Sequence, residues 1–239
     1  MGPRLWRQRA LLRRHWKPIV LLGLLGGGIH NVLQYWGLQY TSATNGAILN
    51  SLTPALIIVM GALLLRDPLP RLAVLGASIA FIGVLALITQ LDAEVLLNLR
   101  VNPGDVLIML SHVMLAGYTL SLRWRPQGLD ALSFLACFAL VALVPVGTAY
   151  TFEPGAVILN RTSLLGIAYV AIFPALLAYH FWNLGVAAVG AARAGVFFYL
   201  TPFFGSLLAV ALLGERFGLH HAIGMALIVA GVALANRKL

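Results

Sequence analysis

The sequence is poor in charge and has long stretches with no charged residue at all. Only 10% of its 239 residues are Asp, Glu, Lys or Arg, whereas 61% are hydrophobic. A chain of this composition would expose too much apolar surface to remain in water. The runs without a charged residue cover 18–65, 72–91, 106–122, 131–152, 162–192, 194–214 and 217–236. Composition therefore excludes a soluble globular domain and predicts a membrane protein.

The length of these runs sets the expected number of membrane crossings. A helix needs about 20 apolar residues to cross the hydrocarbon core, and the first run is long enough for two helices with a turn at 39–45. Runs such as 55–60 are apolar on every side, which favours helices over the alternating strands of a membrane barrel. The sequence therefore predicts an all-α, polytopic membrane helix bundle of about eight transmembrane helices.

Cysteine and catalytic motifs are almost absent. The single cysteine, Cys137, lies inside a predicted span, so there is no disulfide framework and no cysteine-based metal site. The chain contains no His-Glu-x-x-His, no Gly-x-Ser-x-Gly and no nucleotide-binding loop. Its longest hydrophilic segment has about 17 residues, whereas a nucleotide-binding domain needs about 100 or more. We therefore expect no enzymatic activity, no catalytic residues, no cofactor and no metal.

The basic residues are distributed unevenly between the two predicted ends of the bundle. An even number of spans places both termini on one face, together with the basic segment 1–17 and most other Lys and Arg residues. The opposite face has only Arg100, Arg161 and Arg216. By the positive-inside rule, this predicts a multi-pass protein of the plasma (inner) membrane with both termini in the cytoplasm. The net charge of +9 reflects that asymmetry, and no nucleic-acid partner is expected.

An internal repeat is visible in the sequence. Leu52-Thr53-Pro54 recurs as Leu200-Thr201-Pro202, and Leu65-Arg66-Asp67 aligns at matched spacing with Leu213-Gly214-Glu215. At the same offset, Gly76 and Gly83 recur as Gly224 and Gly231. The offset corresponds to an odd number of helices, so the second copy must be inverted in the membrane relative to the first. Inverted repeats are the plan of many secondary transporters.

The repeat resembles that of the drug/metabolite transporter superfamily in its EamA-type branch. The most specific stretch runs from Leu200-Thr201-Pro202 through Leu213-Gly214-Glu215-Arg216 to Gly224 and Gly231. The resemblance implies inverted five-helix repeats, with 18–91 as an incomplete first repeat of three helices and 103–236 as the second repeat of five. The first residue falls in what resembles the loop before the family's third helix. The first two helices are thus expected either to precede the assigned start or to be missing from a shortened form.

Two prolines and a set of polar residues predict the transport site. Pro54 and Pro202 fall near the middle of their spans, and local unwinding there would offer backbone polar groups to a ligand. A simple packing kink is the alternative. Polar side chains within spans turn toward neighbouring helices or a wet cavity. The candidate substrate-binding residues are Asn31, Gln34, Tyr35, Asn50, Thr53, Pro54, His180, Asn183, Tyr199, Thr201 and Pro202.

The acidic residues restrict how an ion could be coupled to transport. No carboxylate lies deep within a predicted span, so a proton-coupled carrier would use a histidine or the shallow Asp105. His112 follows Asp105 by two helical turns on the same face, and these two are the candidate ion-coupling residues. A hydrogen-bonded packing histidine is the alternative. At a helix end, Asp67 is expected to pair with Arg66 or Arg71.

These features predict a secondary transporter that exports or exchanges a small metabolite, amino acid or drug-like solute by alternating access. The export direction is implied by the family resemblance. Aromatic residues such as Trp36 and Trp182 favour an amphipathic substrate. The expected partners are the small-molecule substrate, the lipid bilayer and, as a further candidate, a second copy of the chain. The alternative is a truncated, non-transporting membrane protein or a subunit that packs with a partner.

Overall fold

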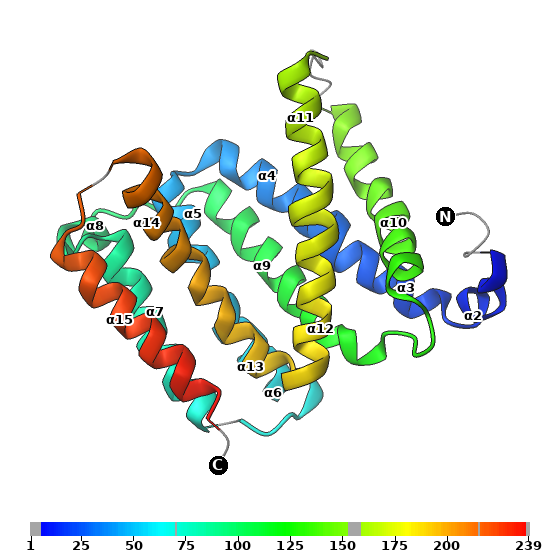
Figure 1. The fold of residues 1–239 in the computed structure, drawn as a ribbon, viewed down its shortest axis with the longest axis horizontal. Helices are drawn as coiled ribbons and strands as arrows, with labels where there is room; N and C mark the ends of the chain where they lie inside the picture. The colour runs from blue at the N-terminus through cyan, green and yellow to red at the C-terminus, as the bar shows by residue number, and fades with distance from the viewer. Residues whose placement is uncertain (1–5, 70, 153–158, 215, 238–239) are drawn as a thin grey trace.

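The computed structural model describes residues 6–69, 71–152, 159–214 and 216–237, and within these ranges the chain is helical without strands. Figure 1 shows the helices side by side as a bundle of tilted rods. The first five residues of the basic segment 1–17 and Glu215 of the repeat motif lie outside the described residues. The predicted all-α membrane helix bundle is confirmed.

Among the described residues, seven helical segments are long and apolar enough to cross a membrane. They are Trp16–Tyr40, Ala43–Leu65, Arg71–Ile88, Pro103–Trp124, Ala131–Phe152, Arg161–Val189 and Ala191–Leu213. A further helix, Leu219–Ala235, is apolar but shorter. Together these account for the eight spans expected from the sequence, with the first beginning at Trp16, before Pro18.

Several spans are built from more than one helical element. Before the first span lies α2 (Arg9–Arg14), and the first span joins α3 (Trp16–Leu22), η1 (Gly23–Ile29) and α4 (His30–Tyr40). The second joins α5 (Ala43–Asn50) to α6 (Thr53–Leu65), and the third is α7 (Arg71–Ile88), followed by the short α8 (Ala93–Leu97). The next two are α9 (Pro103–Ser121) with η2 (Leu122–Trp124), and α10 (Ala131–Phe152). The remaining elements are α11 (Arg161–Val170), η3 (Ala171–Ala178), α12 (Tyr179–Val189), α13 (Ala191–Val196), η4 (Phe197–Tyr199), α14 (Leu200–Leu213) and α15 (Leu219–Ala235).

Helix α9 occupies the middle of the bundle and is the most buried span. It packs against η1, α4, α5 and α6. Its start is fixed by a capping box, in which the Asn102 side chain accepts from the Asp105 backbone N at 3.1 Å and the Asp105 carboxylate accepts from the Asn102 backbone N at 2.9 Å. Pro103 fits the first turn because the N–H that it lacks would have no helical partner there.

Two wide π-helical segments interrupt the first and sixth spans. The η1 segment begins at Gly23 and η3 begins at Ala171, positions separated by the same offset as Gly76 and Gly224. The glycines of η1 allow close packing, because a Cβ on Gly26 would lie 2.5 Å from the ring of Tyr118. Such π-helical turns concentrate at functional sites in proteins.

The two repeated prolines follow helix interruptions. The second span breaks at 51–52, and Pro54 lies in the first turn of α6. In the seventh span, the tight 3₁₀ turn η4 precedes α14, which carries Pro202 in its first turn. Both prolines therefore sit where a missing backbone N–H breaks no helical hydrogen bond.

The outer surface is largely apolar. In the span Arg161–Val189, no residue of the most apolar 18-residue window is buried. Figure 1 shows this span standing at the front of the bundle as one long rod. Such a face suits contact with lipid or with another membrane helix.

Candidate functional site

Two adjoining cavities lie along the first and sixth spans, the larger also bordered by α10 and the smaller by α9 and η4. The larger has a volume of about 580 Å³, and its walls include Asn31, Tyr35, Trp36, Tyr150, Pro174 and Tyr179. The smaller, of about 230 Å³, is lined by His30, Leu115, Pro174, Ala178, Tyr179, Trp182 and Phe198. Because Pro174 and Tyr179 line both, the two cavities meet at the π-helical segment η3. Their combined size is that of a small-molecule site.

The wide turns of η1 are joined to polar side chains that line these cavities. The Tyr179 hydroxyl donates to the Gly26 carbonyl oxygen at 2.5 Å, and Asn31 Nδ2 donates to the Gly27 carbonyl oxygen at 2.7 Å. Tyr179 thus connects the sixth span to the first across the cavity wall. Interhelical bonds of this kind are typical where irregular helical backbone lines a cavity.

Two histidines lie at the inner end of the smaller cavity. His30 lines the cavity and contacts the Ser111 carbonyl oxygen through Nδ1 at 2.9 Å. His112 lies behind it, 2% exposed, with Nδ1 3.1 Å from Thr53 Oγ1. The ring centroids of the two histidines are 6.1 Å apart. The pair therefore joins α4, α6 and α9 at one buried point.

Other polar groups of α9 bond to other helices. Ser111 Oγ lies 2.7 Å from Gln34 Oε1 on α4, and the Tyr118 hydroxyl donates to Asn183 Oδ1 on α12 at 2.5 Å. Trp182 Nε1 donates to Thr119 Oγ1 at 3.3 Å. The central helix is thereby fixed by hydrogen bonds on several sides.

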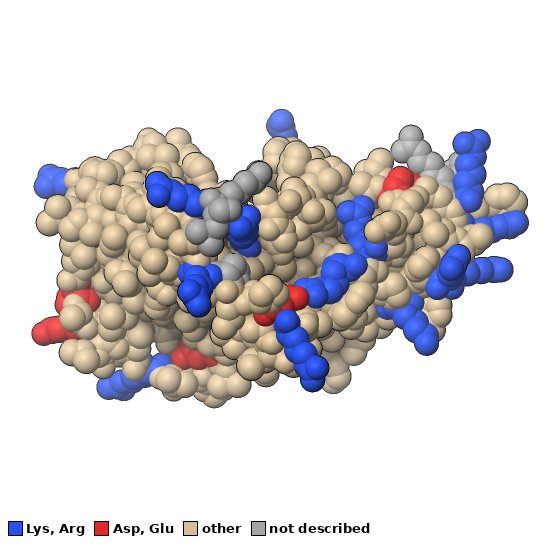
Figure 2. All heavy atoms as spheres, turned by 90° about the horizontal axis from the view of Figure 1, so that it is seen from below, with Lys and Arg blue, Asp and Glu red and all other residues tan. Residues whose placement is uncertain are grey.

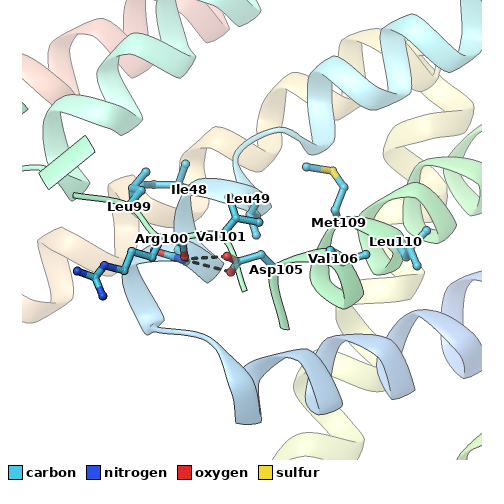
Figure 3. Close-up of a pocket in the computed structure, with 10 residues that line it drawn as sticks. Ile48, Leu49, Leu99, Arg100, Val101, Asp105, Val106, Met109 and Leu110 are labelled. Atoms are coloured by element: carbon cyan, nitrogen blue, oxygen red, sulfur yellow. Dashed lines mark hydrogen bonds between the residues drawn. The ribbon is translucent and has the colours of Figure 1, made fainter. Parts of the chain in front are cut away.

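Asp105 lies at the start of α9, where its carboxylate is held by several donors. Asn45 Nδ2 donates to it at 3.1 Å, and the Thr41 hydroxyl donates to it as well. Together with the Asn102 backbone N, these donors occupy both carboxylate oxygens. A separate pocket of about 330 Å³ opens beside it, and Figure 3 shows apolar side chains around Asp105, while the side chain of Arg100 extends away from it.

The predicted substrate-binding residues occupy different environments. Asn31 and Tyr35 line the larger cavity, whereas Gln34, Thr53 and Asn183 bond to other helices or histidines around α9. The carbonyl oxygen of Asn50, expected to be freed by Pro54, instead accepts from Thr53 Oγ1 at 2.7 Å.

The remaining predicted residues are not among the lining residues of the described cavities. Pro54 and Tyr199 are buried, while His180 and Pro202 are half-buried and Thr201 is exposed. The ring of His180 packs against Phe181 with centroids 5.6 Å apart. The substrate contact of these residues stays a prediction.

Several lining residues were not selected from the sequence. They are His30, Pro174, Tyr179 and Phe198. A signal exists for His30, because an ionisable residue within a span is unusual. Pro174 and Phe198 lie in apolar runs, and it is the packing of distant spans that brings them to the cavities.

Asp67 has a different partner from the predicted Arg66 or Arg71. Its carboxylate forms an ion pair with Arg123, whose Nη1 lies 3.1 Å from Asp67 Oδ1. The hydrogen bond from Arg123 lowers the pKa of Asp67 below its ordinary value. The pair links the segment after α6 to η2, which follows α9. Arg66 and Arg71 are nearer in sequence, but the fold brings Arg123 to the carboxylate.

Comparison with known proteins agrees with this architecture. The uncharacterized transporter YyaM of Bacillus subtilis (strain 168) is 31% identical over 233 residues, covering 96% of this chain and 76% of that protein. A probable terminal-alkyne amino-acid exporter of Streptantibioticus cattleyicolor is 25% identical, covering 92% of this chain and 73% of that protein. One solved crystal structure superposes with a TM-score of 0.78 at 23% identity, covering 98% of this chain and 81% of that chain, which supports the fold.

The sequence profile of the EamA-like transporter family matches residues 1–89 and 102–237. This is nearly the whole chain, and it includes every cavity-lining residue named above. The family and the named relatives indicate a transporter rather than an enzyme. The chain is therefore a multi-pass membrane protein that belongs to the EamA-like transporter family of the drug/metabolite transporter superfamily.

Proposed function

We propose that this protein is a secondary transporter that exports or exchanges a small amphipathic solute across the plasma membrane by alternating access. The observation that carries this proposal is the pair of adjoining cavities along the first and sixth spans. Their walls combine aromatic rings with a few hydrogen-bonding groups, which suits a solute with one apolar and one polar part.

An amino acid or a close derivative fits this lining. Tyr35, Trp36 and Trp182 offer apolar ring surface, while His30 and Asn31 offer polar atoms. Among the described wall residues of both cavities there is no Asp, Glu, Lys or Arg, so the charged groups of an amino acid would be held by hydrogen bonds to neutral polar groups such as Asn31. The relative from Streptantibioticus cattleyicolor is named as a probable amino-acid exporter, which supports the same class of substrate.

The helix interruptions supply positions at which alternating access would bend the spans. The two π-helical segments and the two breaks before Pro54 and Pro202 occur at corresponding places in the proposed repeats, 18–91 and 103–236. Interrupted helices near the membrane midplane are a recurring feature of carriers built from inverted repeats.

The charge distribution favours an orientation with both termini in the cytoplasm. Figure 2 views the end of the molecule at which α15 ends, and lysine and arginine side chains are spread widely over it with few acidic ones between them. Cytoplasmic ends of membrane proteins are enriched in these residues.

Flux through the cavities is the direct test. Everted membrane vesicles containing the full chain would be given radiolabelled L-leucine, L-phenylalanine and ethidium in turn. Ala175→Trp places a large ring in the larger cavity and should abolish the flux of any transported probe, whereas Ala168→Trp on the exposed face of α11 should leave it unchanged. Equal flux in both variants would contradict transport through this cavity.

One observation favours a second candidate, a non-transporting subunit that packs with a partner. In the most apolar 18-residue window of the span Arg161–Val189, no residue is buried, so this part of the span presents an apolar surface. A second copy of the chain could cover it. Cysteine cross-linking from Leu165 and mass measurement in detergent would detect a dimer, and absence of all flux together with a stable complex would favour this interpretation.

A further inference from the structure

We propose that His30 and His112 together form the binding site for a coupling proton. The inference rests on the proposed transport function and names the ion and the residues that hold it. Asp105, the other ionisable candidate, has its oxygens engaged by Thr41, Asn45 and Asn102 at the end of the span. The histidine pair lies deeper, between α4, α6 and α9.

The hydrogen-bond partners of His30 and His112 determine which ring nitrogen carries the proton in each histidine. The Ser111 carbonyl oxygen can only accept, so His30 must carry its proton on Nδ1. Thr53 gives its single hydroxyl hydrogen to the Asn50 carbonyl oxygen, so its Oγ1 accepts from His112 Nδ1. In both neutral rings, Nε2 is then left with a free lone pair.

The Nε2 atom of His112 is the distinctive feature of the pair. It is buried and has no hydrogen-bond partner in the described part of the chain. A buried polar atom without a partner costs about 1–3 kcal/mol, and such atoms occur where a ligand or proton is to be bound. A proton that adds to this lone pair converts the ring to an imidazolium.

His30 gives the proton a route to the cavity. It lines the smaller cavity beside Tyr179 and Trp182, whereas His112 is almost fully buried behind it. With the ring centroids 6.1 Å apart, a second positive charge would be strongly disfavoured. The pair therefore binds one proton, and an imidazolium at His30 presents its charge to a solute in the cavity.

Few other ionisable side chains near the histidine pair could bind this proton. Of the elements packed against α9, the segments α5, α6 and η1 carry no ionisable side chain. The other elements packed against α9 carry His30, Tyr35 and Tyr40 on α4, Lys17 on α3 and Arg123 on η2. Helix α9 itself carries Asp105 and Tyr118, and Tyr179 lies across the smaller cavity. Among these groups, histidine is the one whose neutral ring has a nitrogen lone pair that can accept a proton and release it again.

The bond to Thr53 connects the proton site to the interruption of the second span. Thr53 begins α6, directly after the interruption at 51–52 and before Pro54. Its hydroxyl bridges His112 to the last carbonyl oxygen of α5. Charging His112 therefore acts at the point where the second span is broken.

Nitrogen NMR of histidine-labelled protein in lipid nanodiscs tests the site without any substrate. The wild-type spectrum at high pH should show both His30 and His112 as the Nδ1–H tautomer, which is the minor form in free histidine. As the pH is lowered, the pair should take up a single proton. Signals would be assigned by His30→Gln and His112→Gln, with His15→Gln as the matched control outside the pair.

Variants of Thr53 test whether His112 binds a proton or is only a hydrogen-bonded packing residue. Thr53→Val removes the acceptor of His112 Nδ1–H and should shift His112 toward the Nε2–H form, whereas Thr53→Ser should retain the wild-type tautomer. An Nε2–H tautomer for His112 in the wild type, or no protonation of either ring down to the pH at which the protein unfolds, would overturn the proposal.

Transport in proteoliposomes supplies the second readout. With L-phenylalanine or L-leucine as the probe, an imposed pH gradient should drive uphill accumulation by the wild type at least about tenfold more than by His112→Gln, a difference of about 1.4 kcal/mol. The control variant His15→Gln, outside the pair, should accumulate the probe as the wild type does. Equal pH-driven accumulation by the wild type and His112→Gln would contradict proton binding by the pair. If no probe moves in the wild type, the proposed function fails, while the NMR titration still decides the proton site.

Discussion

Gly76 and Gly231 face each other across the contact between α7 and α15, and neither position has room for a side chain. A Cβ on either glycine would collide with the carbonyl oxygen of the other. The repeat equivalents show the same relationship, since a Cβ on Gly83 would lie 2.7 Å from the Gly224 carbonyl oxygen and one on Gly224 would lie 2.8 Å from that of Gly83. Equivalent residues thus exchange contacts as across a two-fold axis, the symmetry that an inverted repeat requires.

Replacing a glycine of this contact should loosen the pairing of α7 and α15. Gly231→Ala forces the backbones apart and should lower the free energy of unfolding by about 1–3 kcal/mol. Gly205→Ala is the matched control, because nothing lies within 4 Å of a Cβ there and the change should be neutral or stabilising. Thermal unfolding in detergent measures both, and equal midpoints for the two variants would contradict close packing at Gly231.

The buried bond between Tyr118 and Asn183 should contribute measurably to stability. Tyr118→Phe removes the hydroxyl that donates to Asn183 Oδ1 and should cost about 1 kcal/mol. When Asn183→Leu is added to Tyr118→Phe, it removes an amide that is already unpaired, so it should cost less than the same change in the wild type. Simple additivity of the two changes in a double-mutant cycle would argue against this bond.

The ion pair of Asp67 and Arg123 should make a small, pH-dependent contribution. The pKa of Asp67 is lowered in the folded protein, so the stabilisation is present above the ordinary carboxyl pKa and disappears as the pH falls through the lowered value. Both side chains are 38% exposed, so Asp67→Asn should lower Tm by about 2 °C or less at pH 7, and by progressively less as the pH falls through the lowered pKa of Asp67. Glu94→Gln, which alters no ion pair among the described residues, is the control.

Asp105 should behave as a structural group. Asp105→Asn weakens the capping box and the contacts with Thr41 and Asn45, and should cost about 1 kcal/mol of stability. The dependence of probe accumulation on the pH gradient should be unchanged, because the proposed proton site is the histidine pair. A loss of pH-driven accumulation with stability retained would instead assign coupling to Asp105 and His112, the relay expected from the sequence.

The helical membrane fold was predictable because its causes are local. A charge-free run of sufficient length must form a helix in lipid, where each backbone polar group needs an internal partner. The repeat was predictable because its marker residues also have local roles. Pro54 and Pro202 follow helix interruptions, and the paired glycines allow a close helix contact. The family followed from the same motifs.

The candidate site was only partly predictable. Asn31 and Tyr35 were selected as polar or aromatic residues on one helical face, and both line the larger cavity. Gln34, from the same segment, bonds instead with Ser111. Helical periodicity places residues around an axis, but it does not say whether the neighbour at that angle is a cavity or another polar side chain.

What the sequence by itself determined is that this chain crosses the membrane as helices and repeats a unit in inverted register. Both conclusions depend on hydrophobic length and on residue spacing along one chain. Only the tertiary structure decided that His30 and His112 meet, that Arg123 pairs with Asp67, and that Tyr179 closes the wall between two cavities. These relationships join residues from different spans. They depend on how the helices rotate and pack against one another, a three-dimensional result that no local pattern of residues encodes.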